Sequence, residues 1–272
     1  MQLYTQGQTA QFSEQNFAFL EVEEEAHILI IRLDREEKKN ALHPQMVNEI
    51  AYAFQYAHHQ SHIWLIQIEA KGRVFCAGAD LKAFAGMVEP NDSTIPAPNG
   101  DILIAELFRK VHVPILAKIT GDVYAGGFFF LAGSHFVLAS EGIKLGLPEV
   151  KRGLYPFQVM QALFSVMPKR KVLDWCLRGY NLPVEEALQY GLATEISTAD
   201  QIDQRAADLA AEILANSPTA LRKGLEAYDH IQPVEETHSY LMDMLRQTIM
   251  SKDGQEGLAA FRQKRAPEWT GA

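Results

Sequence analysis

Apolar and polar residues follow two different periods along the first part of the chain. Apolar residues over Phe19–Val22 and Ile28–Leu33 predict two strands, which are joined by an acidic turn that begins at Glu23. Pro44 then stands at a position that the first turn of a helix tolerates. Apolar residues follow it at helical spacing as far as Ala57, so this segment predicts a helix with one face toward the core.

Three further segments are apolar almost throughout, as is typical of strands that are covered on both faces. They are Ile63–Ile68, Pro114–Ile119 and Phe136–Ala139. Because strands alternate with helices, we expect an α/β core over residues 1–200. The pattern is helical from there on, so residues 201–272 are expected to form a helical C-terminal region. The segment 87–100 is rich in Pro, Asn and Asp and is expected to be an exposed loop within the core.

Composition and charge narrow the classes of function. The chain has 272 residues, of which 47% are hydrophobic, and this is enough apolar content for a large core. Its formal net charge of −9 argues against a nucleic-acid partner or an anionic membrane surface. The N-terminus has neither a basic start nor an apolar run, so the expected location is the cytoplasm. Cys76 and Cys176 have no metal-ligand spacing and are expected to be reduced thiols.

One group of histidines has the spacing of a metal pair. His58 and His62 lie four residues apart near the end of the predicted helix, and His59 lies beside them. No acidic or sulfur ligand accompanies them locally. We therefore expect the solvated end of a helix, where imidazoles suit the negative end of the helix dipole.

Two glycine-containing turns carry more chemical information. One contains Gly78 and runs from a strand into a short helical pattern, and the other contains Gly126 and leads from a strand into an apolar helical run. Each turn would present backbone N–H groups without a partner at the start of a helix, and such groups attract negative charge. If the two turns converge, they form an oxyanion hole for a carbonyl oxygen. Taken singly, each is weak evidence, because glycine-rich turns between a strand and a helix are usually only turns.

In their order and spacing these segments resemble the crotonase family, also called the enoyl-CoA hydratase/isomerase family. The resemblance covers most of the chain and rests on segments that begin at residue 33 and end near Trp269. The segments are LDREEKKNAL (33–42), FCAGADLK (75–82), AGG (125–127), LGLPEVKRGL (145–154), GYNLPVEEALQYGLATEI (179–196) and AAFRQKRAPEW (259–269).

The resemblance implies a crotonase-like spiral of ββα units with two sheets, followed by a helical C-terminal region that builds homotrimers or homohexamers and contributes to the CoA site. It implies that the oxyanion hole is formed by the N–H groups of Ala79 and Gly126. It also implies that CoA passes Lys38, Ala77, Asp80 and Leu81, and that Phe261 and Lys264 reach CoA from a neighbouring subunit. Plain solvated charge explains Lys38 and Lys264 at least as well, and Phe261 could instead belong to the core.

The family's hydratases use two glutamates, and this chain keeps one of them. The position three residues after Gly126 is Phe129, whereas Glu149 stands twenty residues further on, where the second glutamate is expected. Phenylalanine can neither accept a proton nor anchor a water molecule, and it should raise the pKa of Glu149 by drying the pocket. In having a single carboxylate, the chain resembles the family's Δ3,Δ2-enoyl-CoA isomerases, in which one glutamate moves a proton between two carbons.

Other polar residues leave alternatives open. The aspartate that dienoyl-CoA isomerases carry eight residues after the glutamate is here Phe157, which disfavours that activity. Asp122 could form a turn or supply a second acid, and Asp80 is also explained as a first-turn acid. Tyr124 and Tyr155 either line the acyl pocket or pack in the core.

The sequence thus favours an enzyme that holds a thioester enolate and isomerises 3-enoyl-CoA to 2-enoyl-CoA with Glu149. The alternatives are a hydratase or other lyase with a displaced second acid, and an acyl-CoA-binding protein without catalysis. No separate cofactor is expected, because coenzyme A is part of the substrate.

Overall fold

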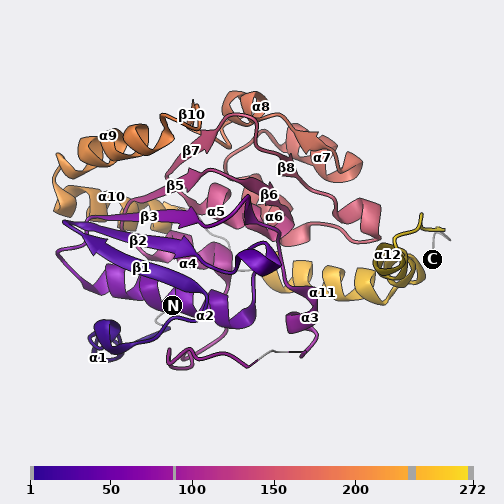
Figure 1. Ribbon diagram of the computed structural model, residues 1–272, viewed down its shortest axis with the longest axis horizontal. Helices are drawn as coiled ribbons and strands as arrows, with labels where there is room; N and C mark the ends of the chain where they lie inside the picture. The colour runs from indigo at the N-terminus through magenta and orange to yellow at the C-terminus, as the bar shows by residue number, and fades with distance from the viewer. Residues whose placement is uncertain (1–2, 88–89, 232–236, 269–272) are drawn as a thin grey trace.

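The computed structural model describes residues 3–87, 90–231 and 237–268, and its elements are arranged as in Figure 1. The strands are β1 (Leu20–Glu25), β2 (Ile28–Leu33), β3 (Leu65–Ala70), β4 (Val74–Cys76), β5 (Ile115–Ile119), β6 (Asp122–Tyr124), β7 (Phe136–Ser140), β8 (Leu145–Gly146), β9 (Asn181–Leu182) and β10 (Glu195–Ser197). The α-helices are α1 (Gln6–Thr9), α2 (Pro44–His59), α3 (Leu81–Phe84), α4 (Ile104–Lys110), α5 (Phe128–Gly133), α6 (Phe157–Leu163), α7 (Lys169–Arg178), α8 (Val184–Gln189), α9 (Ile202–Leu214), α10 (Pro218–Ile231), α11 (Thr237–Met250) and α12 (Lys252–Gln263). The short 3-10 helices are η1 (Phe12–Glu14), η2 (Glu36–Lys38), η3 (Ala125–Gly127) and η4 (Glu149–Arg152).

The strands form two sheets. The six-stranded sheet has the order β1-β2-β3-β5-β7-β10, and only its β1–β2 pair is antiparallel. The four-stranded sheet has the order β4-β6-β8-β9, in which β4, β6 and β8 run parallel. The predicted α/β class is confirmed, and each predicted strand is present to within two residues at its start.

The expected acidic turn after Val22 is wrong, because Glu23, Glu24 and Glu25 belong to strand β1. They pair in register with β2, so that only Ala26 and His27 form the turn. The edge position of β1 explains the difference, since its glutamates face solvent and Arg32 of β2 bridges two of the strand's carboxylates. Charge on an edge strand also opposes pairing with another sheet.

The helical region from residue 201 begins by packing on the core. Ile202, Ala206 and Leu209 of α9 are buried against one face of the six-stranded sheet, over Leu65 and Leu116. Helices α11 and α12 lie at the opposite end of the molecule, at the right of Figure 1, where α11 contacts α6 and α12 contacts η4. The terminal helices therefore reach the segment that carries Glu149. No helix within the described ranges is long and apolar enough to cross a membrane.

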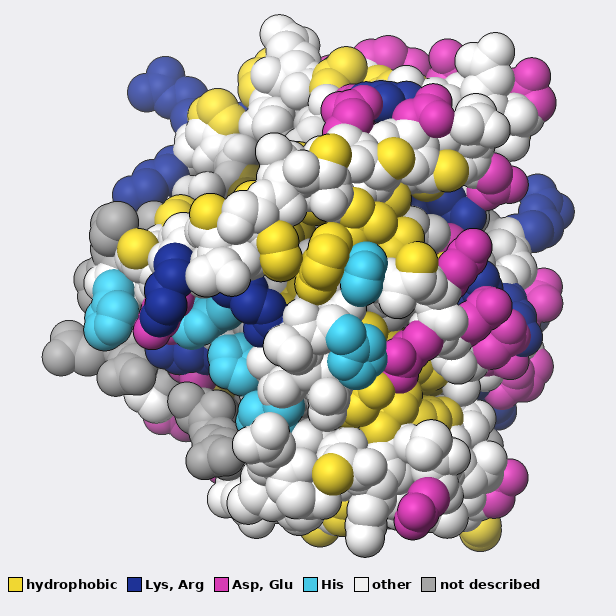
Figure 2. Space-filling view, turned by 90° about the vertical axis from the view of Figure 1, so that its left-hand side faces the viewer, with side chains coloured by type: hydrophobic (Ala, Val, Ile, Leu, Met, Phe, Trp, Pro, Cys, Tyr) yellow, Lys and Arg dark blue, Asp and Glu magenta, His cyan; other side chains and the backbone are white. Residues whose placement is uncertain are grey.

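The end of α2 differs from the solvated helix end that was expected. His58 is half-buried, its Nδ1 lies 2.6 Å from the carbonyl oxygen of Val111, and burial lowers its pKa. Arg222 of α10 covers this helix end and donates hydrogen bonds of 2.8–3.0 Å to four carbonyl oxygens there. His62 is exposed and lies 3.1 Å from Glu24. Figure 2 looks onto this face, where several histidines gather beside basic side chains, yet the described residues contain no group that could hold a metal ion.

Both cysteines are buried and unpaired, as expected of reduced thiols. The described part of the loop 87–100 is also less exposed than expected. Ile95 is buried, and the carbonyl oxygen of Pro96 accepts a hydrogen bond from Asn48 at 3.1 Å. The loop thus covers the start of α2 rather than standing free in solvent.

Candidate active site

Three adjacent parallel strands end at one edge of the four-stranded sheet. Strand β6 lies between β4 and β8, with Val123 paired to Cys76 on one side and to Leu145 on the other. Ala79, Gly126 and Glu149 each lie within three residues after the end of one of these strands, β4, β6 and β8 respectively. Because parallel strands end at the same edge, the topology brings together three positions that are far apart in sequence. All three line one large cleft.

The turns that contain Gly78 and Gly126 are in direct contact. A Cβ atom on Gly78 would lie 3.1 Å from the amide nitrogen of Gly126, and a Cβ atom on Gly126 would lie 3.5 Å from the amide nitrogen of Ala79. The second turn is held in a sparsely populated conformation, because Ala125 has φ +51° although it is not glycine. Such backbone strain is frequent at functional sites.

The two amides have room to donate to a ligand. Leu42 donates a hydrogen bond to the oxygen of Gly78 and accepts one from the amide of Asp80, which makes a parallel bridge centred on Ala79. In such a bridge the amide of the central residue points to the opposite side. The amide of Gly126 belongs to the first turn of η3, where N–H groups lack a partner within the helix. This geometry suits the binding of one oxygen atom that develops negative charge.

Glu149 is the first residue of η4 and lines the cleft. The Oε2 atom is buried and has no hydrogen-bond partner among the described residues. Burial raises the pKa of Glu149 to about 7, although the charge of Arg152 partly opposes this rise. A carboxyl group that titrates near neutrality can both accept and return a proton, as general acid–base catalysis requires.

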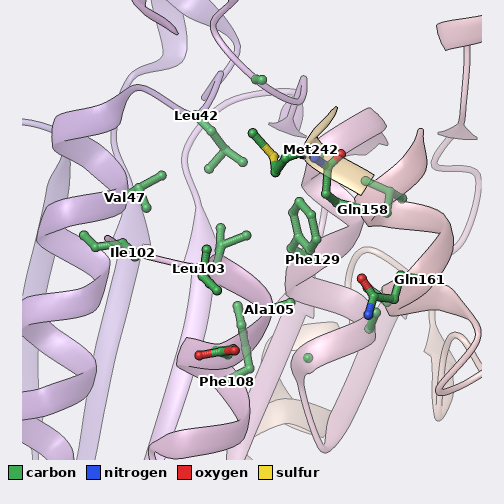
Figure 3. Close-up of a pocket in the computed structure, with 18 of the residues that line it drawn as sticks. Leu42, Val47, Ile102, Leu103, Ala105, Phe108, Phe129, Gln158, Gln161 and Met242 are labelled. Carbon is green, nitrogen blue, oxygen red and sulfur yellow. Dashed lines mark hydrogen bonds between the residues drawn. The ribbon is translucent and has the colours of Figure 1, made fainter. Parts of the chain in front are cut away.

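The cleft has a volume of about 2280 Å³, and Figure 3 shows part of its wall. Phe129 of α5 points into the space between apolar and amide side chains. This is the position at which the resemblance leads us to expect the other glutamate of a hydratase. The apolar wall is formed by Leu42, Val47, Ile102, Leu103, Ala105, Phe108 and Met242. The amides of Gln158 and Gln161 on α6 lie across the space from Val47 and Ile102, and Gln158 donates a hydrogen bond of 2.6 Å to the Sδ atom of Met242.

Two of the residues that the resemblance assigned to CoA binding also line the cleft. Ala77 lies just before the first turn, and Leu81 begins α3 with 48% of its surface exposed. Asp80 does not line the cleft. Its carboxylate caps α3 by accepting from the amides of Lys82 and Ala83, and it pairs with Arg35 at 2.8 Å. The geometry of Asp80 therefore supports the alternative reading as a first-turn acid.

The other three residues assigned to CoA binding lie outside the cleft wall of the described chain. Lys38 ends the short helix η2 and is exposed, and Lys264 is exposed at the C-cap of α12. Phe261 is on α12 and is 55% exposed, but the guanidinium carbon of Arg152 lies 4.2 Å from its ring centroid.

Asp122 and Tyr124 are bound to each other. The Tyr124 hydroxyl donates to the Asp122 carboxylate at 3.0 Å, and the amide of Lys144 donates to the same carboxylate at 2.8 Å. Neither side chain lines the cleft, so the geometry favours a turn-forming role for Asp122. Tyr155 does line the cleft.

Sequence reasoning missed several residues of the site. Arg152 follows Glu149 by three positions within the same motif and could have been found from this spacing. Met242 on α11 and the glutamines on α6 carried no signal, because only the tertiary packing of the C-terminal helices brings them to the cleft.

Known proteins resemble this chain over most of its length. Residues 23–272 match the family described as enoyl-CoA hydratase/isomerase. The chain is 31% identical to mevalonyl-coenzyme A hydratase sidH of Aspergillus fumigatus, over 89% of this chain and 91% of the relative. It is 30% identical to enoyl-CoA hydratase EchA19 of Mycobacterium tuberculosis, over 91% and 95% of the two chains.

Solved structures show the same arrangement of elements. A carnitinyl-CoA dehydratase from Mycobacterium avium 104 superposes with a TM-score of 0.80 at 25% identity, over 94% of this chain and all of that chain. A methylmalonyl CoA decarboxylase superposes with a TM-score of 0.78 at 20% identity, again over 94% of this chain and all of that one, and this likeness concerns the fold alone.

Proposed function

Because this chain belongs to the enoyl-CoA hydratase/isomerase family and has the crotonase fold, we propose that it moves the double bond of a 3-enoyl-CoA thioester to the 2-position. In this proposal the amides of Ala79 and Gly126 bind the thioester oxygen, and Glu149 transfers the proton. Coenzyme A enters as part of the substrate.

The proposed reaction begins with the binding of the thioester carbonyl to the two amides. Hydrogen bonds from both amides stabilise negative charge on the oxygen, so a proton on the α-carbon becomes more acidic. The carboxylate of Glu149 removes this proton and leaves a dienolate. The protonated Glu149 then returns the proton to the γ-carbon, and the double bond lies between the α- and β-carbons in the product.

One observation carries the preference for isomerisation over water addition. Phe129 points into the cleft where a second carboxylate would be needed to activate water, whereas Glu149 is retained at the strand ends. Proton transfer between two carbons needs a single acid–base group, and an apolar wall keeps water from trapping the intermediate.

The direct test is the absorbance of the conjugated 2-enoyl product when the enzyme meets a 3-enoyl-CoA. Glu149→Gln should lower the rate by about a hundredfold to ten-thousandfold, the range for loss of a general acid–base group. Circular dichroism should stay unchanged, because glutamine has nearly the same shape. A rate for Glu149→Gln equal to that of the unchanged enzyme would sink the mechanism.

The second candidate is addition or removal of water, and the names of the relatives favour it, since they are hydratases and dehydratases. Such an activity would need a second acid besides Glu149. Glu106 and Asp243 line the cleft and are tested first, whereas Asp122, the acid that the sequence suggested, lies outside the cleft wall and is tested after them. The variants Glu106→Gln, Asp243→Asn and Asp122→Asn remove these acids one at a time. This candidate would be favoured if the enzyme hydrates crotonyl-CoA at a rate comparable with isomerisation and one of the three variants loses that activity.

A third possibility is an acyl-CoA-binding protein without catalysis. Calorimetry with crotonyl-CoA would then give binding while a panel of saturated and unsaturated thioesters gives no turnover. The homotrimer or homohexamer that the family resemblance implies remains part of the proposal, and light scattering coupled to gel filtration would measure it.

A further inference from the structure

A second charged residue shares the short helix that carries Glu149. Arg152 ends η4, three residues after Glu149, and both residues line the cleft. In a 3-10 helix, residues three apart lie one above the other, so these two side chains leave the same side of the turn. The charge of each group influences the pKa of the other, and Arg152 lies outside the oxyanion segments.

The guanidinium group of Arg152 is held by an aromatic ring of the terminal helix. Its central carbon lies 4.2 Å from the ring centroid of Phe261 on α12, within the distance of a favourable cation–π contact. The described residues give it no ion pair within 4.0 Å. Burial lowers the pKa of Arg152, and the charge of Glu149 acts in the opposite direction. The two charges thus influence each other from the same turn without a direct salt bridge.

Helix α12 is seated on η4 by contacts that only glycine permits. A Cβ atom on Gly257 would lie 2.2 Å from the carbonyl oxygen of Arg152. A Cβ atom on Gly153 would lie 2.3 Å from the carbonyl oxygen of Asp253, so the contact is made from both sides. The backbones of α12 and η4 are thus in direct contact, and a side chain at Gly257 or Gly153 would force the two elements apart.

We propose that Arg152 is a positioning residue for Glu149, and that α12 holds both by packing its glycine face and Phe261 on the turn that carries them. This inference rests on the proposed role of Glu149 as the proton-transfer group. In the proposed arrangement the positive charge of Arg152 favours the carboxylate form of Glu149 in a site whose burial opposes it. Helix α12 would then influence proton transfer by Glu149 through Arg152. In this proposal the role of Phe261 is to hold Arg152, a role that does not depend on contact with CoA.

Other charged and titratable groups surround the pair. They are Cys176 of α7, Asp243 and Arg246 of α11, which pair at 3.2 Å, and Asp253 and Glu256 of α12, the latter paired with Arg265. Lys151 of η4 is exposed. Among these groups, Lys151 offers the matched control, because its removal takes the same charge from the same turn at a position that faces solvent.

The experiment compares Arg152→Gln and Lys151→Gln by the pH dependence of kcat/KM with a 3-enoyl-CoA. Arg152→Gln should move the acidic limb upward by about half to one pH unit, because the nearby charge that favours the carboxylate is gone. The rate at pH 6 should then fall about threefold to tenfold while the rate at pH 9 changes little. Lys151→Gln should leave the profile in place, and Arg152→Lys should give an intermediate shift.

A second readout keeps the inference separate from the proposed reaction. Glutamate labelled with 13C at the carboxyl carbon gives a titration signal for Glu149 that Glu149→Gln identifies, whether or not the enzyme isomerises the substrate. An upward shift of that titration in Arg152→Gln, with no turnover in any variant, would retain the inference and overturn the proposed function. An unchanged titration in Arg152→Gln would overturn the inference. The inference would also be overturned if Arg152→Gln raised KM at every pH and left the acidic limb unchanged, because this result would assign Arg152 to substrate binding.

Discussion

Gly78 and Ala125 lie so close together that a Cβ atom on Gly78 would be 2.6 Å from the Cβ atom of Ala125. Gly78 belongs to the turn before Ala79, and Ala125 belongs to the turn before Gly126. Both residues have positive φ values, +92° and +51° respectively. This contact fixes the separation of the two amides, and any side chain at position 78 would push the turns apart.

We therefore expect Gly78→Ala to lower kcat by at least about a hundredfold, the usual effect of losing one oxyanion donor. Unfolding in urea should show a loss of about 2–4 kcal/mol, from the positive φ and the overpacked contact. Gly142→Ala is the matched control, since Gly142 has φ +74° and open space around its Cβ position. It should cost about 1–2 kcal/mol and leave kcat unchanged. Equal loss of activity in both variants would contradict the role of the contact.

Glu149 should make activity depend on pH near neutrality. Because burial raises its pKa to about 7 and the carboxylate is the base, kcat/KM should fall about tenfold for each unit below that pH. A stopped assay from pH 5 to pH 9 measures this limb. A profile that is flat through pH 7 would argue against Glu149 as the base.

The same shift predicts a cost to stability. A carboxyl group with a raised folded-state pKa binds its proton more tightly in the folded than in the unfolded chain, so stability is lost as pH rises from about 4.5 through 7. Glu149→Gln should therefore be more stable than the unchanged protein by roughly 2–3 kcal/mol at pH 8, and equal to it near pH 4. Denaturant unfolding at the two pH values would check this, and a less stable variant at pH 8 would contradict the burial that raises the pKa of this carboxyl group.

Phe129→Glu should shift the reaction toward water addition. A carboxylate at this wall of the cleft can hold and deprotonate water, and two acids close together raise each other's pKa. We expect hydration of crotonyl-CoA to rise at least about tenfold above its starting rate. Phe129→Gln controls for polarity, because it can bind water but accepts no proton. A gain in Phe129→Gln as large as in Phe129→Glu would show that dryness, and not acid–base chemistry, limits hydration.

Gly257→Ala should separate α12 from the turn that carries Glu149. The added methyl group would lie 2.2 Å from the carbonyl oxygen of Arg152, so the helix must shift, and kcat should fall about tenfold or more. Gly224→Ala in α10 is the control, since nothing lies within 4 Å of its Cβ position. Alanine there should stabilise the helix by about 1 kcal/mol and leave kcat unchanged.

Arg222 should matter for stability alone. It donates hydrogen bonds to four carbonyl oxygens at the end of α2, in a half-buried position away from the three strand ends. Arg222→Ala would leave these groups without partners, and we expect a loss of about 2–4 kcal/mol in the free energy of unfolding. The kcat measured below the unfolding temperature should not change, and a marked fall would indicate a connection to the site that the packing does not reveal.

The sequence by itself determined the class of fold and the positions that define the site. Apolar periods located the starts of β1, β2, β3, β5 and β7 to within two residues, because burial on one or both faces leaves a local signature in the chain. They set no bounds for the shorter strands β4, β6, β8, β9 and β10. The motifs around Gly78, Gly126 and Glu149 pointed to an oxyanion site with a single acid, and Phe129 was visible as the missing partner. Family membership followed from the same segments.

Only the tertiary structure decided which side chains share the site. The edge strand turned the expected acidic turn after Val22 into β1, since pairing with β2 outweighs the weak strand preference of glutamate. Packing of α10 buried His58, and packing of α12 placed Phe261 on Arg152 beside Glu149. The contacts of α10 and α12 join residues more than a hundred positions apart, and no local period records them, because they depend on how separate elements meet in space.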